Sequence, residues 1–209
     1  MSPTSDKPTL AGQFVDLRAL TPDDAELTFA WRQGVRAILL NQGAQTVEQQ
    51  RRWIASRPAS EYNFIIETKQ HRAIGMLSLS GIDAVNRVGE PGRFLIGDEL
   101  AAAGLPAAAE AMKLLYEFAF DTLKLRRVWG VVASENRRMI KWQTFLGMTQ
   151  EGRLRQHLFI NDRLQDSVVF GLLDDEYRRV TLPRLESLIA AARLPIAPSA
   201  PSAPSAATE

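Results

Sequence analysis

The chain has 209 residues, 45% of them hydrophobic, which is enough to bury the core of one domain of ordinary size. Its 25 lysines and arginines balance 24 aspartates and glutamates, so the net charge of +1 gives no general attraction for nucleic acid or an anionic membrane surface. Cysteine is absent and there are two histidines, which excludes disulfides, thiolate nucleophiles and Cys/His zinc clusters. We expect a cytoplasmic protein, because no run of about 18 apolar residues predicts a membrane span.

The first half of the chain predicts a Ser/Thr/Pro-rich, loose N-terminus over residues 1–12, followed by strands and helices. Thr21 with Pro22 and an acidic first turn is typical of a helix start, and Thr46 opens a second helix. The polar stretch "KQHR" separates two β-rich runs and indicates a hairpin. The expected elements are strands at 13–20, 63–69, 73–85 and 92–99 and helices at 21–33 and 46–57.

The second half contains the most regular helical pattern, with apolar residues recurring at the period of a helix from Ala107 to about Lys124. Asn136 is the predicted N-cap of the next helix and Gly147 its stop. The pair Asn161-Asp162 predicts a hairpin turn. The expected elements are helices at 107–124 and 136–147 and strands at 126–133, 150–160 and 165–173. This order predicts an α/β fold, a mixed sheet with helices on its faces.

The end of the chain is expected to be accessory to a main domain at 13–177. Residues 178–193 predict one amphipathic helix, which would cover its own domain or pair with a second chain. Residues 194–209 form a Pro/Ser/Ala repeat that cannot bury enough surface to fold, so we expect a disordered tail.

Several stretches resemble the GNAT superfamily of acyl-CoA N-acyltransferases: "VDLRALTPDDAELTFAWR", "AIGMLSLSGID", "GEPGRFLIGDE", the segment from "EAMKLLYEF" to "FLGM", and "GRLRQHLFINDRLQDSVVFGLL". The resemblance covers roughly residues 13–177 and is strongest to the branch of ribosomal-protein N-terminal and amino-sugar N-acetyltransferases. "FAWRQ" and "VEQQRRWI" favour the amino-sugar group, including enzymes that acetylate nucleotide-linked 4-amino sugars. The resemblance implies a GNAT fold, a twisted, mostly antiparallel sheet with splayed central strands.

The resemblance also implies the reactants. Acetyl-CoA, or another acyl-CoA, would be the donor, with no metal, and a small-molecule primary amine would be the acceptor for a monomer or homodimer. One alternative is a ribosomal-protein-type N-terminal acetyltransferase. Another is a binding or partner subunit that keeps the fold and has lost acyl-CoA chemistry.

Two strands that pair at one end and separate at the other leave backbone groups which a pantetheine arm can join like a short strand. Here the strands would be 93–97 and 128–133, and N–H groups near Leu95 and Ile96 would polarise the thioester carbonyl. The loop after the first strand would present N–H groups and a helix dipole to the pyrophosphate. The candidate backbone donors are Gly104, Leu105, Ala107, Ala108 and Ala109.

This loop departs from the family pattern Q/R-x-x-G-x-G/A. Aligned from the following helix, the basic or amide position is Ala103 and the central glycine is Pro106, which has no N–H. Proline is also favoured at the first position of a helix, so a helix start that binds no anion is the alternative.

The helix after residue 136 holds further candidates for donor binding. Asn136 matches the family's asparagine that contacts the pantetheine, although it could equally be only a cap. Gln143 stands where many members carry a tyrosine that protonates the leaving thiolate, and glutamine can donate a hydrogen bond but cannot deliver a proton. Arg137, with Arg138 and Lys141, could meet the 3′-phosphate of CoA, or these charges are simply solvated.

Four residues are candidates for the acceptor and the catalytic base. Glu90 and Asp83 are the possible bases, and each could instead be a solvated turn residue. His157 lies on a predicted strand where the resemblance implies substrate-facing polar residues, while a lone histidine is more often structural. Arg32 could bind an acceptor phosphate or carboxylate bidentately, or be a surface charge on a helix.

Overall fold

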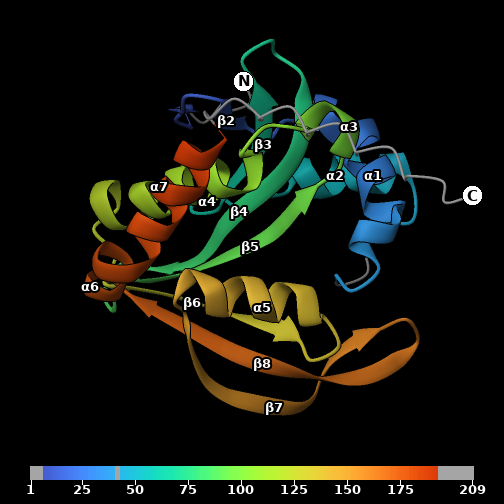
Figure 1. Cartoon of the computed structure of the whole chain (residues 1–209). Coiled ribbons are helices and arrows are strands. Elements are labelled where there is room, and N and C mark those ends of the chain that lie inside the picture. The colour runs from blue at the N-terminus through green and yellow to red at the C-terminus, as the bar shows by residue number, and fades with distance from the viewer. Residues whose placement is uncertain (1–6, 41–42, 193–209) are drawn as a thin grey trace, which may run out of the picture.

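Eight strands form one sheet in the computed structural model, which describes residues 7–40 and 43–192 (Figure 1). The order across the sheet is β1-β2-β3-β4-β5-β6-β8-β7, and neighbouring strands are antiparallel except β5 and β6. The strands are β1 (Leu10–Ala11), β2 (Val15–Ala19), β3 (Tyr62–Thr68), β4 (Ala73–Asp83), β5 (Val88–Ile96), β6 (Arg127–Ala133), β7 (Thr149–Ile160) and β8 (Arg163–Leu173). The mixed, mostly antiparallel sheet predicted from the sequence is confirmed.

Helices connect and cover these strands. They are α1 (Ala25–Gln33), α2 (Val47–Ala55), α3 (Glu99–Ala102), α4 (Ala107–Glu117), α5 (Arg137–Leu146), α6 (Asp174–Glu176) and α7 (Leu182–Ala191). Short 3-10 turns lie at Pro22–Asp24 and Val35–Ala37, and π-helical turns lie at Phe118–Thr122 and Tyr177–Thr181. In the described part of the chain, no helix is long and apolar enough to cross a membrane.

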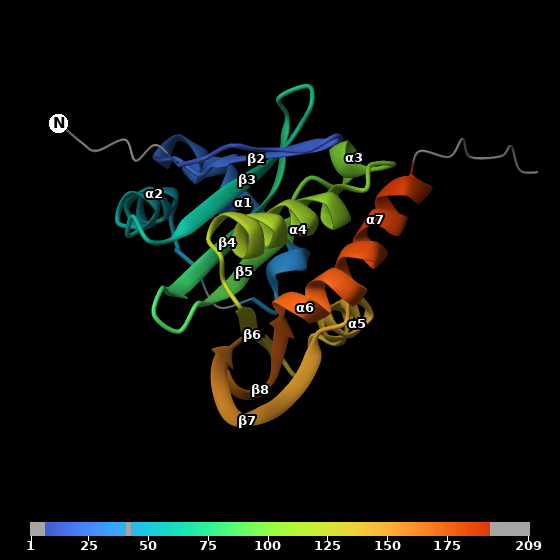
Figure 2. The same ribbon diagram turned by 90° about the vertical axis from the view of Figure 1, so that its left-hand side faces the viewer.

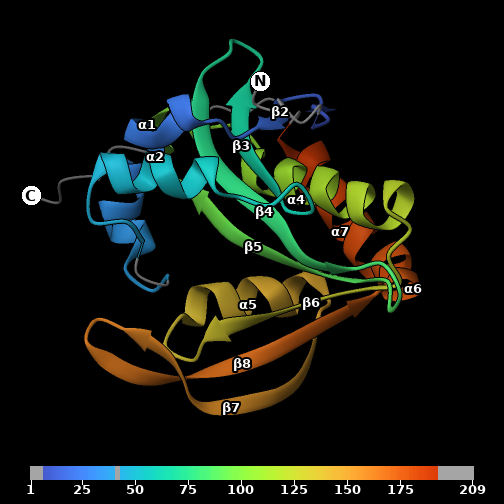
Figure 3. The same cartoon turned by 180° about the vertical axis from the view of Figure 1, so that it is seen from behind.

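The two faces of the sheet are covered by different helices because alternate residues of a strand point to opposite faces. Phe64 and Leu77 pack in the main core with the buried residues of α4. Ile65 and Met76 pack on the other face with Trp31 of α1. Figures 1 and 3 show α1 and α2 on one side of the sheet and α4 and α7 on the other.

The predicted caps and turns form as the local sequence indicates. Thr46 Oγ1 accepts a hydrogen bond of 3.1 Å from the N–H of Gln49 at the start of α2. Asn136 Oδ1 does the same for Met139 at the start of α5, at 3.1 Å, and Gly147 ends α5 with a φ of 92°. Between β7 and β8, Asn161 and Asp162 have φ values of 52° and 58°, the left-handed conformation that a two-residue hairpin turn needs.

Several expected boundaries are wrong. The third apolar strand begins at Val88, not near residue 92, because Pro91 and its flanking glycines resemble a turn in the sequence. The long helix expected at 107–124 is α-helical only to Glu117 and continues as a π-helical turn. The helix expected from Thr21 starts with a 3-10 turn, and the short helix α3 was not predicted.

The two ends of the chain also differ in part from expectation. Leu10 and Ala11 of the segment expected to be loose form β1, paired with β2. Leu185 and Ile189 of α7 are buried in the main core. The helix α7 lies against α4 (Figure 2), so it covers its own domain. The expected tail at 194–209 lies outside the described residues.

Candidate active site

The parallel strands β5 and β6 are paired at one end only. Val88 lies opposite Arg127 and Gly89 opposite Val128, and no further pair joins these strands in residues 7–40 and 43–192. β6 stays paired with β8 along its whole length, and β5 with β4. The two strands therefore separate beyond Gly89 (Figure 3), and the predicted splay is confirmed. Pro91 is tolerated there because a strand with a neighbour on one side only need not supply every N–H.

A bulge distorts β5 along the open stretch. Met76 pairs with Leu95 but Ser78 pairs with Gly92, so two steps along β4 match three along β5. Within this bulge Arg93 has a φ of 53°, in the left-handed region. A bulge bends the strand and changes the direction of its side chains. Arg93 therefore reaches side chains of β3 and β4 beside the opening.

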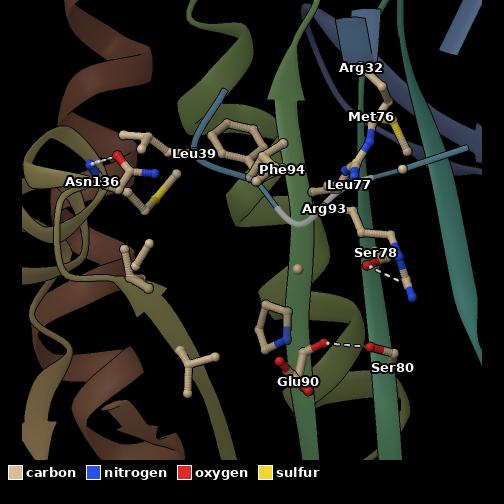
Figure 4. Close-up of a pocket in the computed structure, with 18 of the residues that line it drawn as sticks. Arg32, Leu39, Met76, Leu77, Ser78, Ser80, Glu90, Arg93, Phe94 and Asn136 are labelled. Atoms are coloured by element: carbon tan, nitrogen blue, oxygen red, sulfur yellow. Dashed lines mark hydrogen bonds between the residues drawn. The ribbon is translucent and has the colours of Figure 1, made fainter. Parts of the chain in front are cut away.

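A pocket of about 630 Å³ lies where the two strands separate (Figure 4). Its apolar side includes Phe94 of β5, Met112 and Leu115 of α4, Val132 of β6 and Met139 of α5. Its charged side includes Arg32 of α1, Gln50 and Trp53 of α2, and Glu90 and Arg93 of β5. A concave pocket of this size with a few polar groups is typical of a small-molecule site.

Glu90 lines this pocket from β5, not from the turn that its sequence context suggests. Burial raises the pKa of its carboxyl group, while the charges of Arg93 and His157 act in the opposite direction. Within the described residues the carboxylate makes no hydrogen bond; only the backbone oxygen accepts one, from Ser80 Oγ at 3.4 Å. A pocket carboxylate with a raised pKa and no bound partner can accept a proton from a substrate.

Arg93 is held in place by a network of side chains. Its Nη1 lies 3.0 Å from Glu61 Oε1, and it donates hydrogen bonds of 3.2 Å to Asn63 Oδ1 and to Ser78 Oγ. Its guanidinium also lies over the ring of Trp53, with Cζ 5.2 Å from the ring centroid. Arginine stacked on an aromatic ring and bonded in this way loses little further freedom when it binds a ligand.

Arg32 lies on the same side of the pocket as Arg93 (Figure 4). Burial lowers the pKa of its guanidinium, and the positive charge of Arg93 lowers it further. The guanidinium remains protonated, since arginine is charged at any pH that a protein survives. Two cations thus face one pocket.

The helix α5 brings polar groups to the apolar side. Asn136 and Gln143 both line the pocket, as does Trp142. Asn136 Oδ1 caps the helix, which leaves the NH2 group of the same side chain to face the pocket. Gln143 Oε1 and Trp142 Nε1 are buried and have no hydrogen-bond partner in the described part of the chain. Buried polar atoms of this kind usually bind water or a ligand.

The loop before α4 forms no side-chain cap for that helix. Gly104 has a φ of 77°, a conformation that glycine adopts without strain, and Pro106 is the N-cap residue, not the first helical residue. The N–H groups of Ala107, Ala108 and Ala109 make no hydrogen bond within the described residues. The first turn of any helix leaves its N–H groups without a partner inside the helix. These three donors and Leu105 lie outside the residues that line the pocket.

The remaining candidates from the sequence lie elsewhere. Asp83 ends β4 and accepts hydrogen bonds from the N–H groups of Asn86 and Val85, which lower the pKa of its carboxyl group. His157 is a residue of β7 and lines a separate depression, where its Nδ1 is 2.9 Å from Ser167 Oγ, although its charge still acts on the carboxyl group of Glu90. Arg137 is exposed at the start of α5. The side chain of Leu95 is buried in the core, and the next residue, Ile96, ends β5.

The structure thus brings four sequence candidates to one pocket: Arg32, Glu90, Asn136 and Gln143. It adds Arg93, Trp53 and Phe94, which sequence reasoning missed. Arg93 directly follows "GEPG", and only the bulge in β5 reveals that its side chain reaches Glu61.

Comparisons with known proteins agree with this architecture. Residues 15–149 match the family model described as "Acetyltransferase (GNAT) domain". The protein "Putative ribosomal N-acetyltransferase YdaF" of Bacillus subtilis (strain 168) is 34% identical over 103 residues, which cover 49% of this chain and 55% of that protein. The spermidine N(1)-acetyltransferase of Escherichia coli (strain K12) is 30% identical over 118 residues, which cover 56% of this chain and 61% of that enzyme. The chain therefore spans less than two thirds of the length of either relative.

A solved structure extends the likeness to most of the chain. The crystal structure of a GCN5-related N-acetyltransferase from Brucella melitensis matches with a TM-score of 0.74 at 26% sequence identity. The match covers 88% of this chain and 86% of that one.

Proposed function

The chain belongs to the GNAT acetyltransferase family, and we propose that it transfers an acetyl group from acetyl-CoA to a primary amine of a small molecule. The observation that carries this proposal is Glu90, a carboxylate with a raised pKa in a pocket at the separation of β5 and β6. The pocket combines a base, an apolar channel and strand edges that have no partner. An amine acyltransferase needs each of these.

The residues present fit a CoA donor. The open edges of β5 and β6 would pair with the amides of the pantetheine arm, and Asn136 and Gln143 offer side-chain hydrogen bonds on α5. The N–H groups of Ala107 to Ala109 and the dipole of α4 would hold the pyrophosphate. Pro106 and Ala103 add neither an N–H nor a side chain there, so backbone donors would carry this contact.

The proposed transfer is direct, without a covalent enzyme intermediate. Glu90 takes a proton from the ammonium group of the acceptor, directly or through a water molecule, and so generates the neutral amine. The amine nitrogen then attacks the thioester carbonyl carbon, and a C–N bond forms. The nitrogen, which now bears a positive charge, releases its second proton to solvent, and the C–S bond breaks. The thiolate leaves with the bonding electron pair and is protonated from solvent, because Gln143 has no proton to give. Backbone N–H groups of the bulged part of β5 stabilise the negative charge on the carbonyl oxygen.

Within this class, we propose an amino sugar, free or linked to a nucleotide, as the acceptor. The charged side of the pocket favours it over a polyamine, because Arg32 and Arg93 would repel a ligand that carries only positive charge. The relative from Bacillus subtilis favours the N-terminal amine of a ribosomal protein as the second candidate.

Calorimetric titration with acetyl-CoA, followed by thiol release with a panel of amines, tests the proposal. We expect saturable binding of acetyl-CoA and thiol release with amino sugars. Absence of binding at millimolar acetyl-CoA would instead support a partner subunit without acyl-CoA chemistry. Turnover restricted to peptide N-termini would defeat the amino-sugar assignment.

A further inference from the structure

We propose that Arg32 and Arg93 form an anion-binding subsite, so that the acceptor carries a phosphate or carboxylate group as well as its amine. This inference rests on the proposed function, because it assigns a chemical class to the acceptor of that reaction. It is argued from the contacts on the charged side of the pocket, where both guanidinium groups lie (Figure 4).

The first argument is that the surrounding side chains hold the guanidinium group of Arg93 in one position. Its hydrogen bonds and its ion pair in the described residues all use Nη1, and they join it to Glu61, Asn63 and Ser78. The guanidinium groups of Arg93 and Arg57 both lie over the ring of Trp53, with their Cζ atoms 5.2 Å and 4.6 Å from its centroid. A guanidinium bonded through one nitrogen still has other N–H groups in a fixed plane, which suits bidentate binding of a phosphate or carboxylate.

The second argument is the balance of charge. The buried carboxylate of Glu61 lies 3.0 Å from Arg93 and 3.6 Å from Arg57, so one anion serves two cations. Arg32 adds a further cation, and Glu90 is the one acidic side chain among the described residues that line the pocket. Among the described residues that line the pocket, positively charged side chains therefore outnumber negatively charged ones. Burial and the charge of Arg93 already disfavour the charged form of Arg32, and a bound anion would offset both effects.

The third argument is the spacing along β5. Glu90 and Arg93 are three positions apart on this strand, and because the bulge redirects the chain between them, both side chains line the same pocket. An amine at Glu90 and an anionic group at the two arginines can thus belong to one small molecule. A phosphorylated amino sugar and an amino acid both have this combination of groups.

Binding of matched pairs of amines tests the subsite without any need for turnover. One pair is glucosamine and glucosamine 6-phosphate, and the other is β-alaninamide and β-alanine. Titration calorimetry measures the Kd of each compound for the wild-type chain, for Arg32→Gln and for Arg32→Lys. Arg52→Gln is the matched control, because Arg52 is an exposed arginine of α2 outside the pocket. Thermal melts verify that each variant is folded.

We expect an anionic member to bind at least about tenfold more tightly than its neutral partner, as charge-assisted hydrogen bonds predict. Arg32→Gln should abolish this difference, Arg32→Lys should keep part of it, and Arg52→Gln should keep it in full. The phosphate pair and the carboxylate pair show which anion is preferred. Equal binding within both pairs, or no binding of any member at millimolar concentration, overturns the subsite. The subsite is also overturned if Arg32→Gln lowers the affinity for CoA but leaves the binding of both amine pairs unchanged, because Arg32 would then bind the donor and not the acceptor.

The same compounds separate this inference from the proposed function. If the anionic amines bind through Arg32 but no amine causes thiol release from acetyl-CoA, the subsite stands and the acetyltransferase proposal fails. If spermidine and the neutral amines are acetylated as well as the anionic amines, the transferase proposal stands and the anion subsite fails.

Discussion

The sheet is built differently on the two sides of β5. On one side, β2 to β5 pair along most of their lengths, and Glu110 of α4 ties the start of β2 to the helix. Its carboxylate accepts hydrogen bonds of 2.7, 2.6 and 2.8 Å from the N–H groups of Gln13, Phe14 and Val15. On the other side, β5 and β6 share the two pairs near Gly89 and then separate.

Because of this difference, we expect the paired strands to contribute mainly to the stability of the fold and the separated strands to contribute mainly to catalysis. The paired side contributes Val15, Leu17, Phe64 and Leu77 to the main core. The open side leaves strand edges, a pocket and a desolvated carboxylate, each of which costs stability unless a ligand binds. We therefore expect substitutions on the open side to affect activity and those on the paired side to affect folding.

Glu90→Gln tests the open side and should have the largest effect. Loss of the general base should lower kcat by about 10²- to 10⁴-fold, because the amide cannot accept the proton of the ammonium group. The wild-type rate should fall with decreasing pH as Glu90 becomes protonated, and the raised pKa places this fall above the range of an ordinary glutamate. Steady-state thiol release as a function of pH measures both effects.

The matched control is Asp83→Asn, since Asp83 holds a turn outside the pocket. Its rate and pH profile should stay close to those of the wild type. A Glu90→Gln variant with an unchanged acidic limb would show that another group titrates, and the base would have to be assigned elsewhere.

Glu110→Ala tests the paired side. The change removes an acceptor that serves three backbone N–H groups and leaves the buried N–H of Val15 without a partner, so the free energy of unfolding should fall by about 3 kcal/mol. Urea unfolding measures this loss. The kcat of the folded fraction should remain unchanged, and a large fall in kcat without loss of stability would break the distinction between the two sides.

The double substitution Ala103→Arg with Pro106→Gly tests the end of the open side and should have the smallest effect. It supplies an N–H at the N-cap of α4 and a cation in the preceding loop, so acetyl-CoA should bind up to about tenfold more tightly. Calorimetry measures the Kd, with Ala102→Arg as a control for added charge alone. An unchanged Kd in the double variant would mean that this loop does not hold the pyrophosphate.

Much of the local structure follows from the sequence because its signals act over a few residues. Thr46, Asn136 and Gly147 cap helices through contacts within four positions, and Asn161-Asp162 forms its turn alone. The start of β5 was missed for the same reason. Pro91 and the nearby glycines favour a turn locally, and they are overridden by pairing with the preceding strand β4, in which Leu79 lies opposite Pro91.

The candidate site follows from the sequence only in part. Glu90, Arg32, Asn136 and Gln143 were chosen by residue type and by resemblance, and all four line the pocket. Nothing within the sequence separated Glu90 from Asp83. The hydrogen bonds to Asp83 and the burial of Glu90 separate them, and both arise from folding.

The sequence by itself determined the order of the main strands and helices, several of their caps and the family resemblance, because periodicity, capping and turn preferences are properties of neighbouring residues. The tertiary structure alone decided that β5 bulges at Arg93, and that Glu61, Asn63 and Ser78 meet its side chain there. It also decided that Arg32 of α1 faces the same pocket. These contacts join residues far apart in the chain, and their electrostatics depend on burial, which no stretch of sequence specifies.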